Sequence, residues 1–120
     1  MRFFLDTYAI VEIMKGNKAY EKYLSEELHT SILNLYELYY NILKEHGEEK
    51  AKEYFYIFYS KLVTIKDEHI FYASKIKFRF KKRDISYTDA LGYAISEQEG
   101  MKFLTGDKEF KDLENVEYVK

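Results

Sequence analysis

The sequence contains no cysteine, which excludes disulfide frameworks, thiolate metal sites and cysteine nucleophiles. Long apolar runs are also missing: the longest uncharged stretch, Leu28–Tyr36, has nine residues, far fewer than a membrane-spanning helix needs. Near the N-terminus, Asp6 interrupts Phe3-Phe4-Leu5 before the core of a signal peptide could form. We therefore expect a cytoplasmic protein with no membrane partner. A net charge of −2 provides no general attraction for nucleic acid, so any such binding would require a local basic patch.

The residues that are present indicate one folded domain over residues 1–120. The chain is 47% hydrophobic and 18% aromatic, enough for a single core. The expected strands are Arg2–Leu5, His29–Leu33, Leu62–Ile65, Met101–Leu104 and Val116–Val119. The expected helices follow Asp6, run from Asn34 to Gly47, cover Glu48 to about Lys61, follow Asp67, and span Ser86–Gly100. Strands that alternate with helices indicate an α/β sandwich with a mostly parallel sheet.

Four carboxylates stand at the ends of these elements: Asp6, Glu37, Asp89 and Asp107. Ligands of parallel sheets bind outside the carboxyl ends of the strands, so one crevice could hold all four. Structural explanations also exist, because Asn34-x-x-Glu37 and Ser86-x-x-Asp89 match helix-capping patterns and Gly-Asp favours a turn. Asp6 is harder to explain in this way. A carboxylate beside an apolar strand loses water, and its nearest candidate cation along the chain is Arg2.

Converging carboxylates repel one another and need a cation between them. Oxygen-only ligands suit Mg²⁺ or Mn²⁺, and no histidine stands beside these acids to favour zinc. Mg²⁺ keeps several waters and is normally completed by phosphate oxygens of a substrate. The four acids therefore predict metal-dependent phosphodiester chemistry in which an activated water attacks.

Four short motifs resemble the PIN-domain family in order and spacing: Leu5-Asp6-Thr7, Tyr36-Glu37-Leu38, Ser86-Tyr87-Thr88-Asp89-Ala90 and Phe103-Leu104-Thr105-Gly106-Asp107-Lys108-Glu109-Phe110. The resemblance covers the whole chain. It implies a three-layer α/β/α sandwich with a mostly parallel sheet of about five strands. It also implies a metal-dependent endoribonuclease and, for a short single-domain member, the VapC-like toxin of a toxin–antitoxin pair. RNA would then be the substrate and an antitoxin the protein partner.

The same resemblance implies roles for individual residues. It assigns Asp6, Glu37, Asp89 and Asp107 to catalysis and to binding of Mg²⁺ or Mn²⁺, Thr105 to an auxiliary hydroxyl and Asp112 to an accessory acid. Tyr8 departs from the family pattern, because many members have a smaller polar residue after Asp-Thr. Tyr8 would narrow the site or stack on a base, which affects substrate preference rather than the acid set.

A basic run contains six cations within nine residues: Lys75, Lys77, Arg79, Lys81, Lys82 and Arg83. One interpretation is a solvated helix face; the other is a patch that binds RNA phosphates, with Phe78 or Tyr87 stacking on bases. Between Tyr36 and Tyr59 the aromatic residues exceed what two helix faces can bury. The remainder could form a homodimer or antitoxin surface.

Two other functions match parts of this pattern. A catalytically silent PIN-like module would keep the acids for structure and bind protein or RNA without cleavage. A phospho-acceptor receiver domain also places carboxylates at strand ends, but Val63-Thr64-Ile65-Lys66 has no acceptor aspartate. The complete set of four acids favours the ribonuclease.

Overall fold

Short strands alternate with helices along the chain in the computed structural model, which describes residues 1–120. The strands are β1 (Arg2–Leu5), β2 (Glu27–His29), β3 (Lys102–Thr105) and β4 (Val116–Tyr118). The α-helices are α1 (Thr7–Met14), α2 (Ile32–His46), α3 (Glu48–Ile57), α4 (Asp67–Arg79) and α5 (Tyr87–Gln98). Three 3₁₀ helices complete the fold: η1 (Lys18–Tyr23), η2 (Tyr59–Lys61) and η3 (Lys108–Phe110). None of the helices combines the length and the apolar character that a membrane crossing requires.

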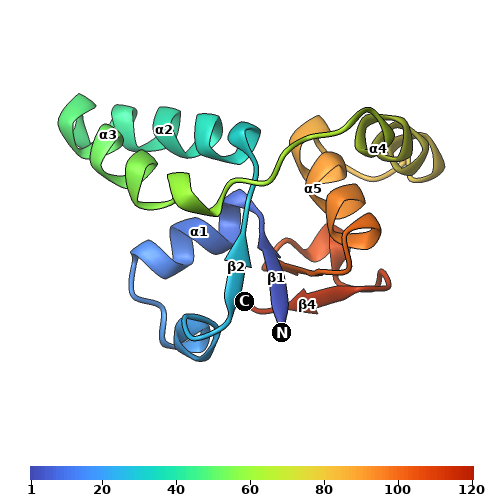
Figure 1. Ribbon diagram of the computed structural model, residues 1–120, viewed down its shortest axis with the longest axis horizontal. Helices are drawn as coiled ribbons and strands as arrows, with labels where there is room; N and C mark the ends of the chain where they lie inside the picture. The colour runs from blue at the N-terminus through green and yellow to red at the C-terminus, as the bar shows by residue number, and fades with distance from the viewer.

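The four strands form one parallel sheet in the order β2-β1-β3-β4. Side chains alternate along the central strand β1, so Phe3 and Leu5 pack with α1, α2 and α3, while Phe4 packs with α4 and α5. Figure 1 shows these two groups of helices on opposite sides of the sheet. The arrangement confirms the predicted α/β/α sandwich with a parallel sheet.

The segment Leu62–Ile65, predicted as a strand, does not become a fifth one. It makes a single parallel bridge, between Thr30 and Leu62. The Thr30 backbone accepts from Val63 N at 3.0 Å and donates to the Lys61 carbonyl at 3.0 Å. Pairing stops there because the chain beyond Thr30 turns at once into α2, which leaves no further strand residue as a partner. The sheet therefore has four strands instead of about five.

The helix α2 begins earlier than its sequence pattern predicts. The expected strand His29–Leu33 is shifted to Glu27–His29, and the helix starts at Ile32 instead of Asn34. Its N-cap is Ser31, whose hydroxyl oxygen accepts the Asn34 N–H at 3.3 Å. This local capping bond overrides the β-forming residues around it. Glu37 therefore lies beyond the first turn of α2, and the capping explanation for this acid is wrong.

Smaller differences occur in α4. Its N-cap is Lys66, and Asp67 is the first helical residue instead of the predicted cap. The helix continues to Arg79, so the alternating basic and apolar residues there are helical, as predicted.

The helix α5 lies unusually close to the sheet at one glycine. A Cβ atom on Gly92 would stand 2.6 Å from Cε1 of Phe4 and 3.1 Å from Cε1 of Phe103. A side chain at this position would therefore push the helix away from β1 and β3. Gly92 follows Asp89 by less than one helical turn, so the same contact sets how close Asp89 comes to the strand ends.

Candidate functional site

A cavity of about 440 Å³ opens at the carboxyl ends of β1 and β3 and contains all four predicted acids. Its lining residues are Asp6, Thr7, Tyr8, Glu37, Ser86, Asp89, Gly106, Asp107, Lys108 and Lys120. They come from the ends of two strands, the first turns of α1 and α5, the helix α2 and the C-terminal residue. Parallel strand topology brings these separate segments together at one edge of the sheet.

Asp6 is the most deeply buried of the acids, with 2% of its surface exposed. One carboxylate oxygen accepts the Ala9 N–H at 2.8 Å, which caps α1, and the other accepts the Thr105 hydroxyl. Burial raises the pKa of Asp6 to about 7; the two hydrogen bonds lower it only in part, and the negative charges of Asp89 and Asp107 raise it further. The hydrogen bonds hold this carboxylate in place, although burial removes the water that would stabilise its charged form.

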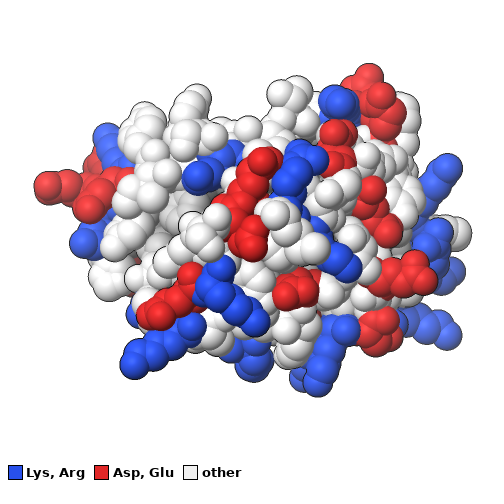
Figure 2. Space-filling view, turned by 60° about the horizontal axis from the view of Figure 1, so that its bottom comes forward, with Lys and Arg blue, Asp and Glu red and all other residues white.

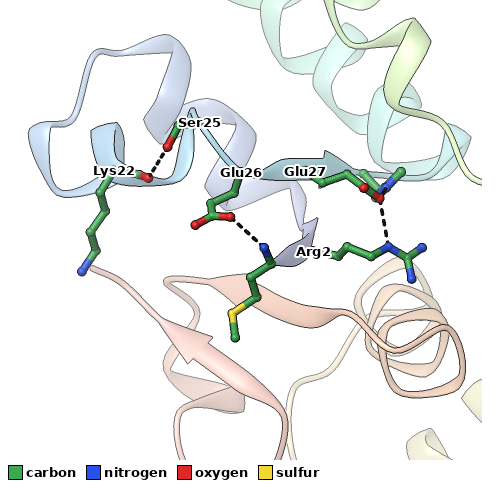
Figure 3. Close-up of polar contacts among 7 residues, drawn as sticks. Arg2, Lys22, Ser25, Glu26 and Glu27 are labelled. Atoms are coloured by element: carbon green, nitrogen blue, oxygen red, sulfur yellow. Dashed lines mark hydrogen bonds and ion pairs between the residues drawn. The ribbon is translucent and has the colours of Figure 1, made fainter.

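Arg2, the nearest cation along the chain, does not neutralise Asp6. It lies at the amino end of β1, where its Nε donates to Glu27 Oε2 at 2.9 Å and its Nη1 donates to the Glu99 carbonyl at 2.8 Å. Figure 3 shows the Arg2–Glu27 pair beside the contact between the N-terminal ammonium and Glu26. The basic side chain is therefore committed to the opposite edge of the sheet from the cavity.

A chain of hydrogen bonds orients Glu37. The Thr7 hydroxyl donates to Glu37 Oε1 at 2.6 Å and accepts from Asn34 Nδ2 at 3.1 Å. Ser31 in turn donates its hydroxyl proton to Asn34 Oδ1 at 2.6 Å. The cap of α2 and the first residue of α1 thus cooperate to aim one carboxylate at the cavity.

Asp89 and Asp107 both line the cavity, and their negative charges repel each other. Burial is the main cause that raises the pKa of Asp89 to about 6, followed by the negative charges of Asp107 and Glu37. The Ser86 hydroxyl accepts the Asp89 N–H at 3.1 Å, so the serine caps α5. Asp107 caps η3 by accepting the Glu109 N–H at 2.9 Å, and its own N–H donates to the Thr105 hydroxyl at 2.9 Å. Thr105 therefore joins Asp6 to Asp107.

The residues present fit a hydrated divalent cation. Every carboxylate and hydroxyl in the cavity offers oxygen, the donor that Mg²⁺ and Mn²⁺ prefer. No three acidic, histidine or cysteine side chains stand close enough to form a closed cage. Mg²⁺ does not need one, because it keeps several waters and is usually bound through one or two carboxylates. Burial is the main cause of the raised pKa values of Asp6 and Asp89, and the neighbouring carboxylates raise them further, so a bound cation would favour the charged form of both groups.

Comparison with known proteins identifies the family. The PIN domain matches residues 3–116 of the chain. The chain belongs to the PIN-domain family. Members of this family are typically ribonucleases that use Mg²⁺. No curated protein matches the sequence at a significant level.

Solved structures of toxin–antitoxin proteins share the fold. VapBC-1 from nontypeable Haemophilus influenzae aligns with a TM-score of 0.79 and 18% identity, over 100% of this chain and 98% of the other. VapC20 from Mycobacterium tuberculosis, a toxin that cleaves the sarcin-ricin loop, aligns with a TM-score of 0.76 and 19% identity, over 98% of each chain. VapBC2 from Rickettsia felis, crystallised with a DNA fragment from its promoter, aligns with a TM-score of 0.75 and 23% identity, over 99% and 98%. This PIN domain therefore has a VapC-like toxin fold.

Not every predicted site residue of this PIN domain reaches the cavity. Asp112 is exposed and forms a two-pronged ion pair with Arg83, with distances of 2.8 and 3.0 Å. Lys77 donates to the Ile85 carbonyl at 2.7 Å. None of the six cations of the basic run lines the cavity: Lys75, Lys77, Arg79, Lys81, Lys82 and Arg83. Arg83 and Lys77 hold the loop before α5, whereas the other four cations are exposed, with Arg79 and Lys81 lying over the rings of Phe80 and Phe78.

Three residues of the cavity carry no role in the sequence analysis. Thr7 orients Glu37, and the motif around Asp6 contains it, so the sequence does hold a signal for it. Lys108 follows Asp107 directly, whereas Lys120 reaches the cavity only because β4 pairs with β3, with Val119 N donating to the Thr105 carbonyl at 2.8 Å. No sequence pattern predicts this placement of Lys120.

Tyr8 narrows the cavity by packing on Gly106. A Cβ atom on Gly106 would stand 2.1 Å from Cε1 of Tyr8, so the Thr-Gly-Asp turn and the tyrosine fit together only with glycine at this position. The wall that the pair forms lies beside Asp107 and Lys120.

Proposed function

We propose that this PIN domain is a metal-dependent endoribonuclease that hydrolyses RNA phosphodiester bonds and acts as the toxin of a toxin–antitoxin pair. The supporting observation is the convergence of Asp6, Glu37, Asp89 and Asp107, from four separate elements, on one cavity. A buried acid, Asp6, with three half-buried acids around it destabilises a fold unless the acids serve a ligand. Family membership provides the reaction class.

The residues of the cavity have different roles in the proposed reaction. A bound Mg²⁺ or Mn²⁺ supplies an activated water and stabilises charge on the phosphate. Asp6, Glu37, Asp89 and Asp107 would hold it, with Thr105 and Thr7 keeping two of these carboxylates oriented. Lys108 and Lys120 offset the negative charge of the acids where the RNA backbone would enter. Because an activated water would be the attacking group, no side-chain nucleophile is required.

The experiment that tests the proposal is cleavage of mixed RNAs with Mg²⁺ or Mn²⁺, with and without chelator. We expect cleavage in the presence of metal, none with excess chelator, and recovery when metal is added back. Single-stranded DNA of the same sequence is the control for the substrate class. RNA that binds but stays intact under all conditions would instead support the catalytically silent binding module.

We propose a cognate antitoxin as the protein partner. One structurally similar protein is a toxin–antitoxin complex from Klebsiella pneumoniae. This chain also has an apolar groove of about 520 Å³ between α4 and α5, lined mostly by hydrophobic residues that include Leu33, Ile65, Ile70 and Phe78. Co-purification with the product of an adjacent open reading frame, lost in Ile70→Glu, would support this assignment. Co-purification that survives Ile70→Glu would place the partner elsewhere. The homodimer stays a prediction that solution mass measurement can test.

The basic run gives a prediction about salt. On the face drawn in Figure 2, Lys and Arg side chains are interspersed with Asp and Glu, so no broad positive field exists there. Local cations must then attract RNA. Changing Lys75, Arg79 and Lys82 together to glutamine should weaken RNA binding, because all three are exposed cations in or just after α4. Each lost phosphate contact lowers the salt slope of binding by about 0.7.

Binding affinities across a salt series, in the Asp89→Asn background, provide the measurement. The matched control changes Lys15, Lys50 and Lys52 to glutamine. It removes the same number of positive charges at positions that also lie outside the cavity but not in the basic run. Equal slopes for the two triple variants would mean that the basic run is only a solvated helix face.

A further inference from the structure

A second, smaller hollow adjoins the acidic cavity. It has a volume of about 240 Å³ and is lined by Tyr36, Glu37 and Tyr40 of α2. Glu37 lines the acidic cavity as well, so one side chain is the common wall of the two spaces. Anything bound in the hollow would therefore lie next to a molecule bound among the four acids.

Two exposed tyrosine rings dominate this hollow. Tyr36 is 71% exposed and Tyr40 is 55% exposed, whereas Leu35 and Leu38 on the inner side of the same helix are fully buried. Residues four apart share one helix face, so the two rings are neighbours. The face continues to Lys44, whose Nζ lies 4.7 Å from the centre of the Tyr40 ring. An aromatic and basic stripe thus runs along α2 away from the acidic cavity.

The size and chemistry of the hollow select its occupant. Only three residues line it, whereas the groove between α4 and α5 has about twice its volume and is lined by ten residues. A helix or strand of a protein partner suits the groove. A nucleobase suits the hollow, because it is planar and stacks on aromatic rings. A phosphate would be repelled by Glu37 but attracted by Lys44 at the outer end.

We propose that this hollow is a nucleobase subsite, in which one unpaired base of the RNA substrate stacks on Tyr36 and Tyr40 while Lys44 contacts a phosphate of the same strand. The inference rests on the proposed function in that the ligand is RNA held at the acidic cavity. Because a stacked base must be free of its complement, the substrate is single-stranded or looped at this nucleotide. The subsite adds a determinant of substrate choice beyond Tyr8.

Binding of short oligoribonucleotides tests the proposal directly. The probe is an eight-nucleotide oligouridylate with 2-aminopurine at each position in turn, and its partner carries an abasic residue at the same position. Both are titrated into protein with the Asp89→Asn change, so that the probe stays intact. At one or two positions we expect the 2-aminopurine fluorescence to be quenched by stacking, and Tyr36→Leu or Tyr40→Leu to abolish this quenching.

Affinity should follow the same pattern. Tyr36→Leu should weaken binding about tenfold, as for other stacked bases, while Tyr36→Phe keeps the ring and the affinity. The abasic residue should weaken binding to the Asp89→Asn protein. It should not weaken binding further when Tyr36→Leu is also present, because both changes remove the same stacking contact. Tyr56→Leu is the matched control, because Tyr56 is 66% exposed on α3 and lines neither space. It should leave binding unchanged.

Additive effects of the abasic residue and Tyr36→Leu, or unchanged binding by both leucine variants, would overturn the subsite and assign the rings to a protein interface. Failure of the parent protein to bind any probe would overturn it too. The cleavage assay separates this result from the proposed function. If the effects of the abasic residue and Tyr36→Leu are non-additive but the wild-type protein does not cleave RNA, the subsite is supported and the nuclease proposal is wrong. If the wild-type protein cleaves RNA but the two effects are additive, the nuclease proposal is supported and the subsite is wrong.

Discussion

Asp89→Asn should reduce the rate constant of RNA cleavage by orders of magnitude while the protein stays as stable as the wild type or becomes more stable. The Asp89 carboxylate lies in the cavity, and its pKa is raised to about 6 by burial and by the charges of Asp107 and Glu37. Asparagine keeps the shape and removes the charge that a cation would bind. The cap of α5 is preserved, because the Ser86 hydroxyl accepts the backbone N–H of residue 89. Single-turnover cleavage rates and thermal unfolding measure the two quantities.

Glu37→Gln should also lose cleavage with little change in stability. The glutamine oxygen can still accept the Thr7 hydroxyl, so we expect the free energy of unfolding to change by at most about 1 kcal/mol. Its control is Asp112→Asn, since Asp112 is an exposed acid whose partner is Arg83 and which lies outside the cavity. That variant should cleave RNA at close to the wild-type rate. Near-normal cleavage by Asp89→Asn or Glu37→Gln would return that residue to a structural role.

The metal-free protein should lose stability as the pH rises from about 4 to about 8. Burial raises the pKa of Asp6 from 3.8 to about 7 in the folded state. Between these values the unfolded chain has released the proton and the folded chain still holds it. The folded state therefore binds more protons, and the free energy of unfolding falls with rising pH. The full loss for Asp6 is on the order of 4 kcal/mol, and Asp89 shifts in the same direction.

Thermal unfolding at several pH values, in chelator and in Mg²⁺, measures this effect. Mg²⁺ should raise the Tm most above pH 7, because a ligand that binds only the native state stabilises it and the acids are then fully charged. Asp6→Asn should flatten the pH dependence and remove the Mg²⁺ increment. Asparagine can still cap α1 through Ala9 N–H. A Tm for Asp6→Asn many degrees below that of the wild type at pH 8 would identify Asp6 as a structural partner instead of a ligand.

Much of the fold follows from local patterns in the sequence. Ser86 begins α5, Asn17 caps η1, and Gly16, Gly47 and Gly100 stand at or just beyond helix ends with positive φ, as short-range capping rules predict. Alternation of apolar strands with amphipathic helices was sufficient for the α/β class. Such signals succeed because caps and turns depend on residues three or four apart. They fail where two local preferences compete, as between the β-forming residues after His29 and the Ser31 cap.

The sequence determined which acids stand at element ends, and only the tertiary structure decided what surrounds them. The bond between Thr105 and Asp6 joins residues 99 positions apart, and that between Thr7 and Glu37 spans 30. Thr7 and Thr105 belong to motifs in the sequence, but no local pattern predicts which acid each of them contacts. The placement of Lys120 at the cavity has no sequence signal at all. Likewise Asp112, predicted as an accessory acid, pairs with Arg83 and does not line the cavity. These contacts depend on the register of parallel strands and on how closely α5 packs at Gly92, which many distant residues set together.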